Sequence, residues 1–448
     1  MNGKLVDSVK EALELLGKKN LDGDVFGIKE RNISYSIKKG ELSESSEYED
    51  LGLGIRIIKD GKIGFGYCTP GKEEKGVRRA EELSNISQKL DLALPEEEEE
   101  VPEPKIFDKK VEKSTLEGEG AEFTQQVIDG AKEFKDDIIP TRGSLSIGIG
   151  TKVLGNTKGV FSEHKGTAIS TGVLATIPGD ETSINASESR FSRKMDLDFT
   201  DVGKIAAEKV DSLREGSELP EGKIPVVINP DAFGMLMWFG IIPAINGENI
   251  RKGKSVYEGR KGEKVASEKL LMKDDPTMDW GIGSGSFDDE GVPSKEVPII
   301  KDGILTNFIY DLKEAIKSDT ESTGNGLRGG FKNPPEISDR NIVLRGEGTK
   351  KESLLPEKGI LVDGVMGAHT LNPASGDFSV VGTPAWLVEN GEIKGKVEGA
   401  MISGNLPQTL ESIELADDYK KLYGSIGSRE IKMDLPSARF NDVTISGK

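Results

Sequence analysis

The chain has very few of the residues that form disulfides and zinc sites. Among its 448 residues there is one cysteine, Cys68, and there are two histidines, His164 and His369. A single cysteine cannot form an internal disulfide, which fits a reducing compartment. Zinc takes three or four clustered His, Cys or carboxylate ligands, and the sequence contains no HExxH pair. A zinc site in this chain would therefore have to rely on carboxylates.

Long hydrophobic runs and an excess of positive charge are also missing. The longest uncharged stretch, Ala232 to Gly247, is interrupted by Pro243 and falls short of the ~20 apolar residues of a membrane span. The segment 1–20 is charged throughout, so no signal peptide is predicted. The net charge of −18 is opposite to the basic surface that nucleic-acid binding requires. We therefore expect a soluble, cytoplasmic protein that binds neither membranes nor nucleic acid directly.

Helical periodicity and turn dipeptides occur in separate stretches, without a regular βαβ rhythm. Apolar residues have helical spacing in segments 5–16, 123–134 and 201–213, and Asn229-Pro230-Asp231 predicts the start of a buried helix. Segment 144–177 reads as short antiparallel strands. Asp-Gly or Asn-Gly pairs predict three type I′ hairpins, at Asp60-Gly61, Asp302-Gly303 and Asn390-Gly391. This segregation predicts an α+β fold of antiparallel sheets with packed helices.

An acidic run flanked by prolines divides the chain. Residues 95–105 contain five consecutive glutamates, a composition typical of a solvated linker. A polar break over 214–223 marks a second boundary. The sequence thus predicts two to three domains: an N-terminal α+β domain at 1–94, the linker at 95–105, a central α+β domain at 106–218 and a β-rich C-terminal domain at 219–448.

Two polar clusters are candidate sites. Asp288, Asp289 and Glu290 could bind a cation or supply a general acid. A tight turn explains the same pattern, with Asp accepting from backbone amides and Gly291 at positive φ. The glycine-rich loop 322–330 contains Asn325 and Arg328, and the arginine could clamp a carboxylate. A mobile connection is the alternative interpretation of this loop.

The loop 367–380 places His369 near Asn372, Ser375 and Asp377 in sequence. A Ser-His-Asp triad is defined by its geometry, however, and the chain has no GxSxG elbow. The segment 247–255, GENIRKGKS, has one residue too many for a phosphate-binding loop and is interpreted as a flexible basic loop. His164 is interpreted as a surface or strand-end residue, and Cys68 as structural.

Several segments, taken in chain order, resemble the TldD/PmbA family, whose members are described as modulators of DNA gyrase and as metallopeptidases. The likeness covers nearly the whole chain and lies in IRIIKDGKIGFG, SFDDEGVP, IIKDGILTNFIYDLKEA, STGNGLRGG, GAHTLNPASGDFSV, WLVENGEIKGKVEGAMISGNL and VTISGK. It implies a TldD/PmbA-like fold.

The family has two branches that differ in their metal ligands. TldD-type members have an HExxxH helix and a late cysteine, whereas PmbA-type members, also called TldE, lack these ligands and pair with a TldD subunit. Here the corresponding helix, DAFGMLMWFGIIPAINGEN, has no histidine, and the late segment YGSIGS has no cysteine. The resemblance therefore implies the PmbA/TldE branch, with no metal site or cofactor in this chain and zinc only in a TldD-type partner.

The resemblance also implies a function, because the family's paired subunits enclose a cavity in which unfolded peptides or peptide precursors are cleaved. We expect one subunit of a cytoplasmic peptidase assembly, either a heterodimer with a TldD-type subunit or a homodimer. Candidate peptide contacts are Asn325, Arg328, Asn372, Ser375 and Asp377. Two alternatives stay open: a homodimeric peptide-binding protein without catalysis, and a hydrolase that uses the carboxylates of Asp288, Asp289 and Glu290. His369 is a further catalytic candidate.

Overall fold

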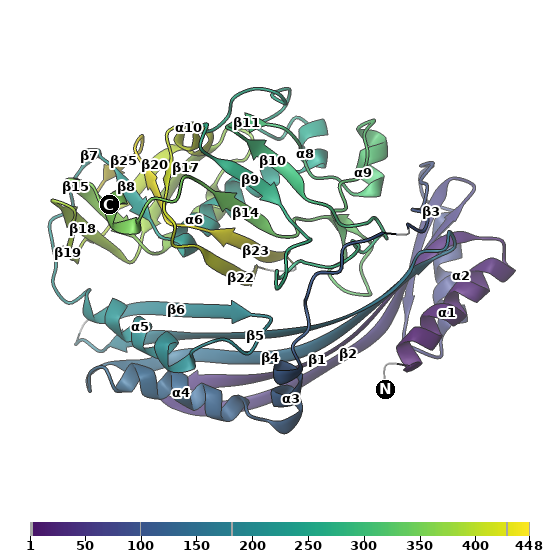
Figure 1. Cartoon of the computed structure of the whole chain (residues 1–448), viewed down its shortest axis with the longest axis horizontal. Coiled ribbons are helices and arrows are strands. Elements are labelled where there is room, and N and C mark those ends of the chain that lie inside the picture. The colour runs from purple at the N-terminus through teal and green to yellow at the C-terminus, as the bar shows by residue number, and fades with distance from the viewer. Residues whose placement is uncertain (1–2, 99, 181, 427–428, 448) are drawn as a thin grey trace.

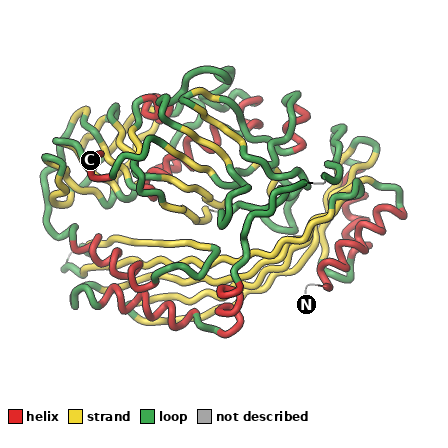
Figure 2. Tube along the Cα trace, in the orientation of Figure 1, coloured by secondary structure: helices red, strands yellow, loops and turns green. Residues whose placement is uncertain are grey.

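A long, curved sheet supports the rest of the molecule (Figure 1). The computed structural model describes residues 3–98, 100–180, 182–426 and 429–447. Helices cover the convex face of this sheet, and the C-terminal part of the chain lies against the concave face. Figure 2 shows that this C-terminal part consists of short strands joined by many loops, with few helices. The predicted α+β class with antiparallel sheets is confirmed.

The long sheet joins the regions before and after the acidic linker. Its strand order is β3-β2-β1-β4-β5-β6. Strand β1 pairs with β2 on one side and with β4 on the other, over nearly its whole length. The regions predicted as N-terminal and central domains therefore share one sheet, whose strands are β1 (Asp22–Lys38), β2 (Glu41–Lys59), β3 (Lys62–Cys68), β4 (Ile139–Asn156), β5 (Phe161–Ile177) and β6 (Ile184–Ser192).

Five helices cover the convex face, and the three predicted from periodicity before residue 220 are confirmed. Their bounds are α1 (Gly3–Lys18), α2 (Glu73–Ser84), α3 (Lys109–Glu117), α4 (Gly120–Lys132) and α5 (Phe199–Asp211). In α1 the predicted apolar stripe is buried, including Leu5, Val9 and Leu16, and each such side chain stabilises the fold by about 1.5–3 kcal/mol. Helices α4 and α5 pack together over the other end of the sheet, around Val127 and Val202.

The C-terminal part contains three larger sheets and a two-stranded one. One has the order β11-β10-β9-β14-β23-β22, the second β19-β18-β15-β8-β24-β21 and the third β16-β17-β20-β25-β7. Two pairs within them, β8–β15 and β14–β23, are parallel, and the other strand pairs of the described residues are antiparallel. Their bounds are β7 (Gly222–Lys223), β8 (Val226–Ile228), β9 (Leu271–Asp274), β10 (Val297–Lys301), β11 (Ile304–Leu305), β12 (Gly326–Leu327), β13 (Glu336–Ile337), β14 (Ile342–Arg345), β15 (Lys358–Val362), β16 (Val365–Met366), β17 (Asp377–Gly382), β18 (Ala385–Glu389), β19 (Glu392–Lys396), β20 (Met401–Asn405), β21 (Glu414–Leu415), β22 (Lys420–Ile426), β23 (Arg429–Leu435), β24 (Ala438–Phe440) and β25 (Thr444–Ser446).

Short helices connect these sheets, and the first of them is the predicted buried helix. It begins at Pro230, continues as one π-helical turn and ends at Ala244. Proline at the first position costs no hydrogen bond, because the first N–H groups of a helix have no partner within it. The helices are α6 (Pro230–Leu236), the π-helix η1 (Met237–Ile241), α7 (Ile242–Ala244), α8 (Gly247–Arg251), α9 (Leu312–Lys317), the 3₁₀ turns η2 (Lys351–Leu354) and η3 (Ala368–Thr370), and α10 (Leu406–Glu411).

The three predicted hairpin turns are confirmed by their backbone angles. In each turn both central residues have positive φ, with values of 53° and 70° at Asp60-Gly61, 53° and 74° at Asp302-Gly303, and 54° and 74° at Asn390-Gly391. Type I′ turns require this conformation, which Asp, Asn and Gly tolerate best.

The predicted acidic linker is an extended strap without helix or strand. We use the word strap for residues 95–98 and 100–107; Glu99 lies outside the described residues. In Figure 1 it is the dark blue segment that passes between the C-terminal part and the long sheet before α3 begins. No helix in the described ranges is long and apolar enough to cross a membrane.

Close helix packing over the sheet generates a prediction about Gly203. A Cβ atom at Gly203 would lie 2.0 Å from the Val127 carbonyl oxygen of α4, so Gly203→Ala should force α4 and α5 apart. We expect a loss of about 1–3 kcal/mol in unfolding free energy, measured by urea denaturation. The matched control is Gly17→Ala in α1, where nothing lies within 4 Å. An unchanged midpoint for Gly203→Ala would contradict the packing described for α4 and α5.

Candidate functional site

The acidic turn around Asp288 and the glycine-rich loop 322–330 come together against the concave face of the long sheet. Phe287 and Phe331 from these regions pack on Phe26 and Leu154 of the sheet. A Cβ atom at Gly52 of β2 would lie 2.3 Å from the Phe331 ring, so glycine is required for this contact. The packing places Asp288, Asp289, Glu290 and Arg328 next to charged residues of β1 and β2.

A buried network of charges joins the loops to the sheet. Asp24 of β1 accepts hydrogen bonds from Arg56 of β2, at 2.6 Å, and from Arg328 of the C-terminal part. Arg56 also donates to Glu290. The side chains of Asp24 and Arg328 are 0 % exposed and that of Glu290 is 1 % exposed. Two arginines and two carboxylates thus neutralise one another away from water.

Burial and neighbouring charges perturb the pKa values in this network. Burial by itself lowers the pKa of Arg56, but Asp24 and Glu290 outweigh it and the net shift is upward. The pKa of Arg328 is lowered by burial, which Asp24 only partly offsets. One N–H-bearing atom of each guanidinium, Nη2 of Arg56 and Nη1 of Arg328, is buried without a hydrogen-bond partner in the described structure. Arg328 also stacks between Phe26 and Phe65, with centroid distances of 5.3 and 5.7 Å.

Asp288 has the hydrogen bonds that the tight-turn interpretation predicts. Its carboxylate accepts from the backbone N–H groups of Glu290, Val292 and Gly326, each at 2.9 Å, and Gly291 has a φ of 89°. Burial and the charge of Glu290 raise the pKa of Asp288 to about 7. The three hydrogen bonds involve both carboxylate oxygens of Asp288, so neither oxygen is free.

Asp289 and Glu290 are held in the same manner, each by a backbone amide of another loop. Asp289 accepts from the N–H of Arg328 at 2.8 Å. Burial raises the pKa of Asp289, but Lys152 and the Arg328 amide outweigh it and the net shift is downward. Glu290 accepts from the N–H of Leu312 at 2.7 Å, at the start of α9. These carboxylates connect the loop 322–330, α9 and the long sheet.

The predicted peptide contacts of the glycine-rich loop are buried. Asn325 donates to Asp274 at 2.6 Å and to the carbonyl of Ser338 at 2.9 Å, and it is 1 % exposed. Arg328 is bound as described above. A peptide could reach Asn325 or Arg328 only if these internal hydrogen bonds broke.

The candidate loop 367–380 is largely exposed and lies beside the π-helical turn. His369 is on the 3₁₀ turn η3, with its ring centroid 6.4 Å from that of Phe239 in η1. The Asn372 side chain accepts from the amide of Ala374, and Ser375 Oγ accepts from the amide of Asp377. The carboxylate of Asp377 accepts from Asn405 at 2.9 Å. Within the described structure His369, Ser375 and Asp377 share no hydrogen bond of the kind that a triad requires.

The described side chains near the π-helical turn do not form a group of zinc ligands. Trp238 and Phe239 occupy this turn, and the Trp238 indole donates to the Glu430 carbonyl of β23 at 3.4 Å. Among the described residues no three His, Cys, Asp or Glu side chains are grouped as metal ligands would be. Gly427 and Ser428, at the end of the segment YGSIGS, lie outside the described residues.

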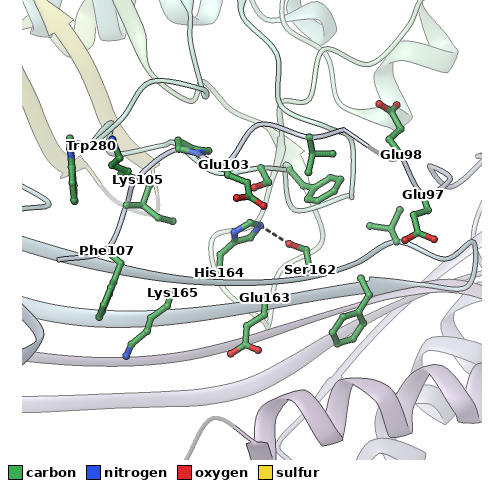
Figure 3. A pocket seen from close by; sticks show the side chains of 17 residues that line it. Glu97, Glu98, Glu103, Lys105, Phe107, Ser162, Glu163, His164, Lys165 and Trp280 are labelled. Atoms are coloured by element: carbon green, nitrogen blue, oxygen red, sulfur yellow. Dashed lines mark hydrogen bonds between the residues drawn. The ribbon is translucent and has the colours of Figure 1, made fainter. Parts of the chain in front are cut away.

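A cavity of about 640 Å³ lies between the strap, the start of β5 and the segment 280–287 of the C-terminal part (Figure 3). His164 points into it and is hydrogen-bonded through Nε2 to Ser162 Oγ at 2.7 Å. Burial, assisted by the positive charge of Lys152, lowers the pKa of His164. The histidine interpreted as a surface or strand-end residue is thus a half-buried strand residue that lines a cavity.

Asp24 and Arg56 are not among the candidate residues singled out from the sequence, although the sequence contains a signal for them. Each charge adjoins apolar residues, since Asp24 precedes Val25 and Phe26 and Arg56 lies between Ile55 and Ile57. Both are buried, and a buried charge needs a partner of opposite sign. Asp24 and Arg56 pair with each other, and their further partners, Arg328 and Glu290, lie more than two hundred residues away in the chain, which the sequence does not reveal.

The central position of Asp24 generates a prediction. Asp24→Asn removes the charge that two buried arginines share, so we expect a loss of about 3–5 kcal/mol in unfolding free energy. Asp22→Asn is the matched control on the same strand, because Asp22 is half exposed and contacts Lys158 at 3.0 Å and Thr157 at 3.2 Å on the surface. That variant should lose at most about 1 kcal/mol. Urea denaturation of both variants checks the prediction, and equal losses would show that the network is not stabilising.

Asp311 generates a pH-dependent prediction. Its carboxylate accepts from the Glu314 amide at 2.6 Å and begins α9, and burial together with Glu290 raises its pKa to about 6. The folded state therefore keeps a proton that the unfolded chain loses above the ordinary value of 3.8, and the stability contributed by Asp311 falls as the pH rises through this window.

Asp311→Asn keeps the cap but cannot titrate. Relative to the wild type, this variant should gain up to about 3 kcal/mol between pH 4 and pH 6.5 and no more above it. Urea denaturation at half-unit pH steps measures the difference. A difference that is constant across the whole pH range would contradict the raised pKa.

Comparison with known proteins shows that three segments of the chain match domains of one family. The C-terminal domain of the PmbA/TldA metallopeptidases matches residues 221–447, their domain 1 matches 23–84 and their central domain matches 104–214. The metalloprotease PmbA of Escherichia coli O157:H7 is 28% identical over 91% of this chain and 90% of its own length. The structure is similar to that of TldE from Thermococcus kodakarensis, with a TM-score of 0.90, 25% identity and coverage of 98% of this chain and 100% of that one.

A second solved structure, from Thermotoga maritima and described as a modulator of a DNA gyrase, matches with a TM-score of 0.87 and 26% identity. It covers 98% of this chain and 99% of that one. The fold, the matched domains and these relatives agree with the resemblance inferred from the motifs. The chain belongs to the PmbA/TldD family of metallopeptidase-related proteins.

Proposed function

We propose that this chain is a PmbA/TldE-type subunit of a peptidase assembly that acts on unfolded peptides or peptide precursors. In this proposal it hydrolyses no peptide bond alone. It supplies one wall of a peptide cavity, and a TldD-type partner subunit supplies the zinc ion and its ligands. The observation that carries the proposal is the π-helical turn of Trp238 and Phe239, which offers indole and phenyl rings and no metal ligand.

The hydrogen bonds of the acidic residues support the proposal that this chain alone is not catalytic. The carboxylates of Asp288, Asp289 and Glu290 accept hydrogen bonds from backbone amides and charged neighbours of this same chain. A general acid or a metal ligand must leave at least one oxygen free for the reacting group. Their present contacts favour a structural role over the alternative of a carboxylate-dependent hydrolase.

The exposed loop with His369 is the candidate for contact with peptide. Asn372 and Asp377 are exposed there and Ser375 is half exposed, beside the partly exposed ring of Phe239. Exposed amide, hydroxyl and carboxylate groups next to an aromatic ring can bind the backbone and side chains of a peptide. The likeness to a protein named TldE supports the choice of branch.

The proposal is tested by measuring metal content and peptide hydrolysis together. The chain is purified without chelator or metal-affinity tag, and its zinc is measured by elemental analysis. A mixture of unfolded peptides is then incubated with the chain, with a TldD-type partner, and with both. We expect substoichiometric zinc, no cleavage by the chain alone and cleavage sensitive to chelator when both are present.

Two results would decide against the proposal. Chelator-sensitive cleavage by the chain alone, with near-stoichiometric zinc, would place a metal site in this chain. Peptide binding by a homodimer, with no cleavage in the presence of any TldD-type partner, would favour the non-catalytic peptide-binding protein. Asp288→Ala and Asp289→Ala test the remaining alternative. If these carboxylates catalyse hydrolysis, the variants lose activity and keep their fold. If the carboxylates are structural, the variants lose only stability.

A further inference from the structure

Strand β5 has one edge that is only half paired. It pairs with β4 from Phe161 to Thr176, whereas β6 covers the opposite edge only from Ile169 to Ile177. The Thr167 amide donates to the Ile106 carbonyl of the strap at 3.0 Å on this opposite edge. Along a strand, backbone groups alternate between its two edges with a period of two. The N–H and C=O groups of Phe161, Glu163 and Lys165 therefore also point away from β4.

These outward backbone groups have no partner among the described residues. Neither a strand nor the strap forms a hydrogen bond with the amides of Phe161, Glu163 or Lys165 on that side. The carbonyl of Val160, which has the opposite parity, accepts from Asn156 on the β4 side, in agreement with the alternation. The start of β5 thus presents an open strand edge.

The strap is fixed at both ends of this open edge and stands away from it in between. Near one end the carbonyl of Pro95 accepts from Asn156 at 2.8 Å. At the other end Ile106 binds Thr167, and Lys105 binds Asp279 and the amide of Trp280. Between these attachments lies the cavity of about 640 Å³, lined by consecutive residues 160–165 of the strand. The run of strand residues that line it matches an extended peptide of about five residues at ~3.3 Å per residue.

The charges of this cavity that have no ion-pair partner in the described structure are acidic. Glu97, Glu98 and Glu103 of the strap and Glu163 of β5 line it, and in the described structure none of the four forms an ion pair. The two lysines of the lining are already neutralised, Lys105 by Asp279 at 2.9 Å and Lys165 by Glu112 at 2.5 Å. In Figure 3 the carboxylate of Glu103 lies above the strand, beside His164.

We propose that this cavity is a binding slot for an extended, basic peptide segment, which adds as a strand to the open edge of β5 beneath the strap. The backbone of Phe161, Glu163 and Lys165 supplies the hydrogen bonds of strand addition. The four unpaired glutamates select lysine and arginine side chains. The slot belongs to this chain alone, so the proposal holds whether or not the chain is part of a peptidase.

The test uses the isolated full chain and two fluorescent seven-residue peptides of alternating threonine, valine and charged residues. One carries lysines and the other carries glutamates at the same positions. Fluorescence anisotropy should show saturable binding of the lysine peptide, weakened by salt, and at least about tenfold weaker binding of the glutamate peptide. Amide hydrogen exchange should slow at residues 161–165 when the lysine peptide is bound.

Variants separate the strand edge from its charge. Glu163→Pro removes one outward N–H and leaves the pairing with β4 intact, because proline is tolerated at an edge that faces away from the ladder. It should weaken binding about tenfold with an unchanged urea midpoint. Glu103→Gln and Glu163→Gln keep the backbone and should each weaken binding of the lysine peptide about two- to fivefold. Glu96→Gln is the matched control, on the same strap but outside the cavity lining, and should have no effect.

Each contrary result overturns a named part of the proposal. Absence of saturable binding, or slowed exchange at residues outside 160–166, would show that the edge of β5 is not a peptide slot. Equal affinity for both peptides would overturn the selection for basic segments. Because no partner subunit is present in these measurements, their failure leaves the proposed peptidase role standing, and failure of that role leaves the slot standing.

Discussion

The ion network around Asp24 is the interaction on which the arrangement of the whole chain depends. Taking a charge out of water costs several kcal/mol unless an opposite charge and hydrogen bonds replace the solvent. Asp24 lies on the concave face of the long sheet, and its two arginines come from β2 and from the C-terminal loop 322–330. The C-terminal part supplies one of these arginines, so Asp24 keeps both partners only when that part lies against the sheet. That position also aligns Glu290 with Arg56 and with the start of α9.

This constraint explains why the most conspicuous acidic motif is part of the scaffold. Strongly perturbed pKa values occur at catalytic sites but also in structural ion networks. Here the raised pKa values of Asp288 and Asp311 have a common origin, which is burial close to the charge of Glu290. Three backbone amides bind Asp288. The turn residues bind the loop 322–330 and the start of α9. The raised pKa of Asp288 is a consequence of this buried position.

The fold thus combines a buried ion network with two surfaces that remain open. One is the exposed loop with His369, which lies beside the aromatic rings of the π-helical turn. The chain belongs to a family of metallopeptidase-related proteins, and this turn offers no metal ligand. The other is the edge of β5 beneath the strap, where backbone hydrogen bonding is incomplete. Open strand edges invite pairing with another chain, and the glutamate-rich strap that covers this one also gives it a negative charge. The acidic segment that reads as a plain linker in the sequence is therefore part of a cavity wall.

The sequence by itself determined the local structure and the family. The apolar stripe of α1, the Asp-Gly and Asn-Gly turns and the proline at the start of α6 depend on neighbouring residues, so their outcome could be read directly. The tertiary structure decided what the polar residues do. Pairing of β1 with β4 merges two predicted domains into one sheet, and burial of Asp24, Arg56 and Arg328 turns distant charges into one network. Such contacts join segments from 32 to 304 residues apart, and their energy depends on removal from water, a property that no local pattern contains.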